Sequence, residues 1–303
     1  MKILLTGSNG QVGHELQQTL QGLGGLVAVD RSSMNLAEVH QIREVIRSVR
    51  PNLIVNAAAY TAVDKAEGEP DLAMRINAEA PAIMAEEAKK LGAAIIHYST
   101  DYVFDGVRVG AYTEDDMPNP QNVYGQSKLA GELALRDSGV PHLILRTSWV
   151  YGNRGNNFLI TMQRLLRERD ELRIVDDQIG APTWCRRIAE KTAEIITQFQ
   201  REPDGKSSDI AQDVWQRYSG LYHLTAQGQT SWYGFAKAIL GEMEFTSATT
   251  ARKPKLIPIT TPDYPLPAKR PSNSVLSSQK LMASFGAIPN WKDDFLRCLS
   301  AVN

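Results

Sequence analysis

Short runs of apolar residues alternate along the first half of the chain with segments in which apolar residues recur every three or four positions. A short continuous apolar run predicts a strand buried on both faces, and the wider spacing predicts a helix with one buried face. The predicted strands span residues 2–6, 26–30, 53–57, 94–98 and 142–149, and the predicted helices span residues 12–20, 36–49, 76–91 and 123–138. This alternation predicts an α/β protein with a doubly wound parallel sheet of the Rossmann-like type. Ligands of such sheets bind at the carboxyl ends of the strands, so the residues that follow each strand are the first candidates for a site.

The regular pattern weakens after Gly152. Residues 186–199 predict a further helix and residues 221–224 a further strand, while the polar stretch 201–220 predicts a surface loop or a short helix. Six prolines in or near residues 249–271 predict an extended segment on the surface. We therefore expect a dinucleotide-binding domain over residues 1–150, to which residues 183–224 return. A smaller C-terminal substrate-binding lobe is expected over residues 151–182 and 225–303.

Composition and charge argue against several classes of protein. The chain has 303 residues and a formal net charge of -1, without the basic excess or the motifs of a nucleic-acid-binding protein. No apolar run approaches the roughly 20 residues of a membrane helix, and the apolar stretch at the N-terminus is too short for a signal peptide. Cys185 and Cys298 are too few for a disulfide framework, and the five histidines lack the spacing of metal ligands. We expect a cytoplasmic protein with reduced cysteines, no metal, and no nucleic-acid or membrane partner.

Three glycines, Gly7, Gly10 and Gly13, lie between the first predicted strand and its helix. Residues without a Cβ let backbone N–H groups approach a pyrophosphate, and the helix N-terminus adds the positive end of its dipole. The G-x-x-G-x-x-G spacing in this context predicts a nicotinamide dinucleotide site. Asp30 ends the second strand, where a carboxylate accepts hydrogen bonds from the adenosine ribose and repels a 2′-phosphate, which favours NADH. Arg31 favours the 2′-phosphate instead, so the choice between NADPH and NADH stays open.

Tyr124 and Lys128 lie four residues apart on one face of a predicted helix, and Thr100 follows the fourth strand. A phenol with a pKa near ~10 is a poor proton donor and acceptor at neutral pH, and a neighbouring ammonium lowers that pKa. We therefore predict that Tyr124 gives a proton to a carbonyl oxygen while hydride reaches the carbon. Thr100 would hold the same oxygen, and Lys128 would also hold the nicotinamide ribose.

Longer stretches extend this pattern: GSNGQVG, VNAAAYTAVDKAE, IHYSTDYVFDG, NVYGQSKLAGE, LRTSWVYG, GNNF, DQIGAPTW, GLYHL and RPSNS. In these stretches, from residue 1 to about 280, the chain resembles the dTDP-4-dehydrorhamnose reductase family of the extended short-chain dehydrogenase/reductase superfamily. YSTDYVFDG and TAVDKAE are specific, whereas the glycine motif and Tyr-x-x-x-Lys are shared with the wider superfamily. The resemblance implies an oxidoreductase that uses NAD(P)H to reduce the C4 keto group of dTDP-4-dehydro-L-rhamnose. This is the last step of dTDP-L-rhamnose synthesis, which serves lipopolysaccharide and cell-wall polysaccharide.

The resemblance also implies roles for individual residues. Cofactor contacts are expected at the glycine motif and at Gln11, Val12, Asp30, Asn35, Leu36, Ala59, Tyr60, Thr61, Tyr98, Tyr124 and Lys128. Substrate contacts are expected at Thr100, Asp101 and Trp149, with Asn157 and Arg270 as further candidates because amide and guanidinium groups suit diphosphate oxygens. Some relatives hold Mg²⁺ at a carboxylate-lined dimer contact. Glu15 matches one such ligand, but the sequence does not supply a full set, and a homodimer is expected only on this resemblance.

Two other functions fit parts of this pattern. A nucleotide-sugar 4,6-dehydratase or epimerase shares the fold and the Tyr/Lys pair, but a dehydratase usually carries adjacent Asp and Glu after the threonine. Here Tyr102 follows Asp101. A non-catalytic NADP-binding regulatory subunit, such as that of methionine adenosyltransferase, would tolerate loss of the Tyr/Lys pair, which this chain keeps. Cofactor binding without turnover of a keto-sugar would favour that second alternative.

Overall fold

The computed structural model describes residues 1–201, 212–244 and 253–301. Its centre is a six-stranded sheet in which all five neighbouring pairs run parallel. The strand order is β10 (Gly220–His223), β5 (His142–Thr147), β4 (Ala94–Thr100), β3 (Leu53–Asn56), β1 (Lys2–Thr6) and β2 (Gly25–Val29). The continuous apolar runs therefore form a parallel sheet buried on both faces, which confirms the predicted Rossmann-like fold.

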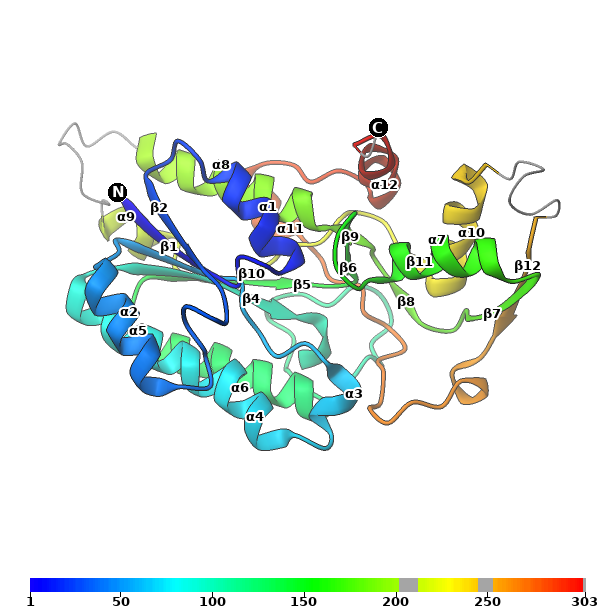
Figure 1. The fold of residues 1–303 in the computed structure, drawn as a ribbon, viewed down its shortest axis with the longest axis horizontal. Coiled ribbons are helices and arrows are strands. Elements are labelled where there is room, and N and C mark those ends of the chain that lie inside the picture. The colour runs from blue at the N-terminus through cyan, green and yellow to red at the C-terminus, as the bar shows by residue number, and fades with distance from the viewer. Residues whose placement is uncertain (202–211, 245–252, 302–303) are drawn as a thin grey trace.

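Helices cover both faces of this sheet (Figure 1). One face packs against α1 (Gln11–Thr19), α8 (Cys185–Arg201), α9 (Gln212–Arg217) and α11 (Gln279–Phe285). The other face packs against α2 (Val39–Val49), α5 (Ala80–Leu91) and α6 (Val123–Asp137). Alternate residues of one strand serve the two cores, as Leu4 and Leu5 of β1 show. The sheet is thus held as the middle of three layers.

The helix before β4 begins earlier than the apolar spacing predicts. Short helix α3 (Val63–Ala66) is followed by α4 (Pro70–Met74), a π-helical turn η1 (Arg75–Glu79), and then α5. Pro70 suits the first turn of a helix, where its missing N–H costs nothing. The π-helical turn carries Asn77, whose buried side chain reaches the loop after β3. Such π-bulges are frequent at functional sites.

The remaining elements form a smaller lobe beside the carboxyl ends of the strands (Figure 1). Its helices are α7 (Phe158–Glu168), α10 (Trp232–Glu242) and α12 (Trp291–Ser300), and they share one apolar core. Its strands pair two by two: β6 (Val150–Tyr151) with β9 (Thr183–Trp184), β7 (Glu171–Val175) with β12 (Lys255–Ile259), and β8 (Ile179–Gly180) with β11 (Thr230–Ser231). Short 3-10 turns η2 (Asp101–Val103) and η3 (Thr261–Asp263) complete the described elements.

Two sequence predictions fall partly outside the described residues. Of the polar stretch 201–220, residues 202–211 are not described, and the rest contains α9 and the first residue of β10. Of the proline-rich stretch, residues 249–252 are not described. The remainder forms the edge strand β12 and then an extended, mostly exposed segment that ends at Pro271. Pro258 lies within β12, which pairs with β7 alone among the described strands, so its missing N–H is tolerated.

The domain division predicted from the sequence stays a proposal, because the chain crosses between the two lobes repeatedly. Helix α11 lies inside the stretch 225–303, yet Leu281 and Phe285 pack in the core of the main sheet. Among the described residues, none of the helices combines the length and the apolar character that crossing a bilayer requires. Cys185 and Cys298 are buried and free, and burial raises the pKa of each thiol to about 12.

Candidate active site

The turn between β1 and α1 is shaped by glycines. Gly7 has a φ of +69°, and a Cβ there would lie 2.7 Å from the backbone nitrogen of Ala58. A Cβ on Gly13 would lie 2.0 Å from the carbonyl oxygen of Gly7, so helix and turn can pack this closely only without a side chain. Gly10 caps α1 without a side-chain hydrogen bond. The first-turn N–H groups of α1 therefore keep no side-chain acceptor, and this cradle fits the pyrophosphate of a dinucleotide.

The Asp30 carboxylate lies at the end of β2 beside this cradle. Its Oδ1 accepts hydrogen bonds from Ser32 and Ser33, and its Oδ2 accepts one from Asn9 at 2.7 Å. The hydrogen bonds from the two serines lower the pKa of Asp30 to about 2. Asp30 is therefore a fixed negative charge at neutral pH, as a ribose-binding carboxylate needs.

The loop after β3 carries Ala59, Tyr60 and the exposed Thr61. Asn77 fixes this loop, because its side chain accepts from the Tyr60 N–H at 2.8 Å and donates to the Tyr60 carbonyl at 3.0 Å. The same amide donates to Ser127 of α6 at 3.0 Å. Our sequence analysis missed Asn77. Its available signal was an asparagine at the start of a helix predicted over residues 76–91, where asparagine is a poor helix former.

Thr100 and Tyr124 meet at the carboxyl end of β4. Thr100 ends the buried strand and caps η2 by accepting from the Tyr102 N–H at 3.2 Å. Tyr124 lies in the first turn of α6, where Asn122 caps the helix by accepting from the Gly125 N–H at 2.8 Å. A hydrogen bond with the Thr100 side chain lowers the pKa of Tyr124, but burial outweighs it and raises this pKa to about 12.

This result corrects one prediction from the sequence, that the pKa of Tyr124 is lowered, because burial outweighs any stabilisation of the phenolate by a neighbouring ammonium. Desolvation of the phenolate dominates, and Lys128 is directed at other partners. Its Nζ donates to the Tyr98 carbonyl oxygen at 2.6 Å and lies 3.3 Å from Nε2 of His97. Burial also lowers the pKa of Lys128, to about 8, against the opposing charge of Glu132. Tyr124 therefore stays protonated at neutral pH and is ready to act as an acid.

Asp101 lies next to Thr100 and is buried. Thr100 Oγ1 donates to Asp101 Oδ1 at 3.0 Å. Burial raises the pKa of Asp101 to about 6, although hydrogen bonds with Ser274 and Thr100 lower it. Asp101 thus has an unusually basic carboxylate within the predicted substrate site, beside the hydroxyls of Thr100 and Tyr124.

Trp149 follows β5 at the same edge of the sheet and has a φ of +49°, which is uncommon for a residue other than glycine. Its ring stacks on Trp232 of α10, with centroids 3.5 Å apart and planes 7° apart. The ring is also tight against Gly180, where a Cβ would lie 2.4 Å from Cε2 of Trp149. Backbone strain of this kind clusters at functional sites, and packing between α10 and β8 maintains it here. Our sequence analysis did not identify the partner Trp232.

Other predicted site residues have their side chains engaged elsewhere. The Tyr98 hydroxyl lies 2.7 Å from Thr192 of α8 in the core, and only the Tyr98 carbonyl faces Lys128. The Leu36 side chain is buried in the core beside α2, and the Asn35 amide caps the Ala37 N–H. Val12 packs against both the sheet core and the lobe core. Tyr98 and Leu36 could therefore contact a cofactor mainly through their backbone atoms, because their side chains pack in the core.

The two candidates for the diphosphate are also held by protein partners. The Asn157 amide donates to Gln11 Oε1 at 2.9 Å and to the Gly152 carbonyl at 2.9 Å, while its oxygen caps α7. It thereby joins the start of α7 to the start of α1. Arg270 forms a bidentate ion pair with Asp64 of α3.

Glu15, the residue that matches a Mg²⁺ ligand of some relatives, has a cationic partner within its own chain. The carboxylate of Glu15 pairs with the Arg186 guanidinium, which also donates to Gln18 at 2.9 Å. Within residues 1–201, 212–244 and 253–301, no group of three His, Cys, Asp or Glu side chains could hold a metal ion.

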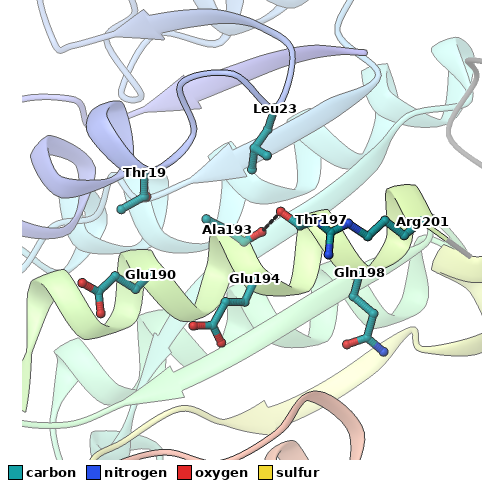
Figure 2. A pocket seen from close by; sticks show the side chains of 8 residues that line it. All are labelled: Thr19, Leu23, Glu190, Ala193, Glu194, Thr197, Gln198 and Arg201. Carbon is teal, nitrogen blue, oxygen red and sulfur yellow. Dashed lines mark hydrogen bonds between the residues drawn. The ribbon is translucent and has the colours of Figure 1, made fainter.

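A wide, open hollow of about 800 Å³ lies on the outer side of α1 and α8 (Figure 2). Glu190, Glu194 and Arg201 line it together with smaller side chains. Thr197 uses its hydroxyl within α8, donating to the Ala193 carbonyl at 2.8 Å. None of the predicted site residues lines this hollow. They lie instead at the carboxyl edge of the sheet, where ligands of such folds bind, and we take that edge as the candidate active site.

Comparison with known proteins shows the family to which the chain is similar. The family described as RmlD substrate binding domain matches residues 1–303. The chain is 45% identical over 294 residues to a dTDP-4-dehydrorhamnose reductase from Burkholderia thailandensis, covering 96% of each chain. It is 44% identical to one from Escherichia coli strain K12, covering 99% of this chain and 97% of the relative.

Solved structures give the same result. A dTDP-4-dehydrorhamnose reductase from Clostridium acetobutylicum matches with a TM-score of 0.87 and 36% identity, covering 100% of this chain and 99% of that one. One from Bacillus anthracis, solved in complex with NADP, matches with a TM-score of 0.86 and 34% identity, covering 99% of both chains.

Proposed function

The chain belongs to the dTDP-4-dehydrorhamnose reductase family, oxidoreductases of the final step of dTDP-L-rhamnose synthesis, and from this premise we propose that Thr100, Tyr124 and Lys128 form its reaction centre. The observation that carries the proposal is that the Thr100 and Tyr124 side chains lie close together at the carboxyl end of β4, near enough for Thr100 to affect the pKa of Tyr124. A substrate carbonyl oxygen placed between these two hydroxyls would accept a hydrogen bond from each.

Tyr124 is the proton donor in this proposal. A bound NADPH or NADH supplies the hydride to C4 of the sugar. As the C4–O double bond becomes a single bond, Tyr124 gives its proton to the oxygen, so that the keto group becomes a hydroxyl. Thr100 holds the same oxygen, and Asp101 and Trp149 position the sugar. Lys128 supplies positive charge that stabilises the phenolate left on Tyr124.

We propose that the glycine cradle and the loop after β3 hold the dinucleotide. Gly7, Gly10 and Gly13 would place the first turn of α1 against the pyrophosphate. Asp30 would accept hydrogen bonds from the adenosine ribose and set the ratio between NADH and NADPH, with the exposed Arg31 available to a 2′-phosphate. We propose that Gln11, Val12, Ala59, Tyr60 and Thr61 surround the cofactor, with Asn35 and Leu36 near the adenine.

We further propose that the protein acts in the cytoplasm on its nucleotide-sugar substrate and that it forms a homodimer. The free, buried thiols of Cys185 and Cys298 are compatible with a reducing compartment. Sedimentation velocity of the purified protein tests the dimer, and the proposed chemistry does not depend on it.

A deuterium-transfer assay tests the function. The protein is incubated with dTDP-4-dehydro-6-deoxyglucose, the matching 3,5-epimerase, and NADPH or NADH deuterated at the nicotinamide C4. We expect oxidation of the cofactor and dTDP-L-rhamnose with deuterium at C4 of the sugar. Cofactor binding without oxidation would instead support a non-catalytic role, and deuterium at another carbon would contradict the assigned reaction.

A further inference from the structure

A buried line of polar side chains leads from Lys128 away from the reacting groups. Nζ of Lys128 lies 3.3 Å from Nε2 of His97, and Nδ1 of His97 lies 2.9 Å from the side-chain amide of Asn56. Asn56 in turn lies 2.7 Å from the Thr6 hydroxyl. The four residues come from α6, β4, β3 and β1, and each is no more than 2% exposed. Neither His97 nor Asn56 has a role in the proposed reaction.

The pattern of donors and acceptors in this line depends on the charge of Lys128. In the orientation of the structure, the Asn56 amide nitrogen faces Nδ1 of His97 and its oxygen accepts from Thr6. An amide nitrogen only donates, so Nδ1 accepts and a neutral ring carries its proton on Nε2. That proton points at Nζ of Lys128. An ammonium also only donates, so this arrangement fits an uncharged Lys128.

A half-turn of the Asn56 amide gives the opposite arrangement. The amide oxygen then accepts from Nδ1–H of His97, and Nε2 is free to accept from the Lys128 ammonium. Thr6 can serve either orientation, because a hydroxyl both donates and accepts, and it also lies 3.3 Å from the Ala58 N–H. All four groups are buried, so a donor facing a donor would be costly in either arrangement.

We propose that His97 is a positioning residue for Lys128: while Lys128 is an ammonium, His97 carries its proton on Nδ1 and accepts from Lys128 through Nε2, and the Asn56 amide turns with it. The inference rests on the proposed role of Lys128. It assigns to His97 the task of keeping Lys128 charged and aimed, as the developing phenolate of Tyr124 requires. Asn56 fixes the tautomer of His97, as hydrogen-bond partners of histidine do elsewhere.

The charged neighbours of His97 are compatible with a neutral ring. Two titratable groups act on the His97 ring, Lys128 of α6 and His142 of β5, and both lower its pKa. Its neighbour on β3, Asn56, is uncharged. Burial and the positive charge of Lys128 hold the pKa of His97 well below its usual value. Glu132, one turn beyond Lys128 on α6, raises the pKa of Lys128 but is itself paired with Arg146 at 2.6 Å and 2.8 Å. His97 is therefore a partner of Lys128 that does not compete with it for the proton.

The tautomer of His97 is measurable without substrate. Protein labelled with ¹⁵N in histidine is studied by long-range ¹H–¹⁵N correlation, and loss of one ring signal in His97→Gln assigns it. At pH 6.5 we expect the proton on Nδ1, followed by a change to Nε2 as the pH rises through about 8, where Lys128 loses its charge. A proton on Nε2 at pH 6.5 would overturn the proposal, even if the reductase activity were intact.

Kinetics give a second, independent readout. His97→Leu removes the acceptor, so the Lys128 ammonium becomes less stable and the alkaline limb of kcat should move to lower pH by about one unit, a tenfold change in the proton affinity of Lys128. His97→Gln keeps an acceptor and should restore most of the shift. Thr192→Val, which removes the partner of Tyr98 on the other side of the same strand, should leave the pH profile unchanged. An unchanged profile in a folded His97→Leu would contradict the proposal.

Discussion

Arg270 holds Asp64 through two hydrogen bonds, from Nη1 to Oδ1 at 2.8 Å and from Nη2 to Oδ2 at 2.7 Å. The pair joins the proline-rich segment to α3, about two hundred residues earlier in the chain. Next to it, the Asn122 amide donates to the Lys269 carbonyl at 2.8 Å. Because Asn122 also caps α6, the segment that carries Arg270 is fastened to the start of the helix that carries Tyr124.

Substitutions of the Arg270–Asp64 pair distinguish two roles of Arg270, binding of the diphosphate and fastening of the proline-rich segment to α3. If Arg270 binds the diphosphate, Arg270→Ala should raise KM for the nucleotide sugar about tenfold, the loss of one charge-assisted hydrogen bond. Asp64→Asn breaks the ion pair but keeps the guanidinium, and should leave KM near the wild-type value. Both variants should lower the free energy of unfolding by about 1 kcal/mol, since the pair is partly exposed. An equal rise of KM in both would show that Arg270 acts only by fastening the segment.

Trp149 should matter more for substrate binding than for stability. Trp149→Ala removes a ring that is proposed to contact the sugar, so KM should rise. Alanine keeps the backbone strain at the positive φ of this position, so the variant gains no stability there and should still fold. Trp232→Leu removes only the stacking partner and should cost about 1 kcal/mol of stability with a smaller change in KM. Steady-state kinetics and urea unfolding of the two variants check this. A larger KM effect from Trp232→Leu would move the sugar platform to Trp232.

The buried ammonium of Lys128 should lower the free energy of unfolding at neutral pH. Its pKa is about 8 in the folded chain against an ordinary 10.5, so the unfolded state binds more protons between these values. The cost is therefore complete below pH 8, shrinks as the pH rises, and is gone above 10.5. Lys128→Met should raise the free energy of unfolding at pH 7, on the order of 3 kcal/mol, while abolishing activity. Urea unfolding at pH 7 and pH 10 measures the difference. A loss of stability at pH 7 would show that the hydrogen bond to the Tyr98 carbonyl outweighs burial.

Asp30 should control the choice of cofactor. Asp30→Ala removes a negative charge from the proposed ribose site, so kcat/KM with NADPH should rise relative to NADH by about tenfold. Ser33→Ala is the matched control, because it removes the hydrogen bonds between the Ser33 hydroxyl and Asp30 and leaves the charge. An unchanged ratio in Asp30→Ala would remove Asp30 from the ribose site.

The sheet was predictable because its strands are continuous apolar runs separated by helices with clear spacing. Leu53–Asn56 and Ala94–Thr100 are examples in which every residue is buried. The strands of the smaller lobe were not predictable, since they pair across long stretches of chain. Lys255 pairs with Glu171, and two-residue strands such as Thr183–Trp184 are too short to show a period.

The candidate site was predictable as far as its motifs reach. Thr100 and Tyr124 do come together, as the strand end and the helix spacing indicate. The surroundings of Lys128 were not predictable, because His97 reaches it from another strand and sequence separation carries no signal for such a contact. The direction of the Tyr124 pKa was wrong for the same reason: desolvation depends on everything packed around a group, and motifs do not report it.

The most direct test of the reaction centre is a single-turnover measurement on the wild type and Tyr124→Phe, each saturated with NADPH and mixed with the keto-sugar. The phenyl ring keeps the shape of Tyr124 but has no proton to give. We predict that Tyr124→Phe binds NADPH within about threefold of wild type, while its rate of cofactor oxidation falls by a factor of about 10² to 10⁴. A rate near that of the wild type would contradict the assignment of Tyr124 as proton donor.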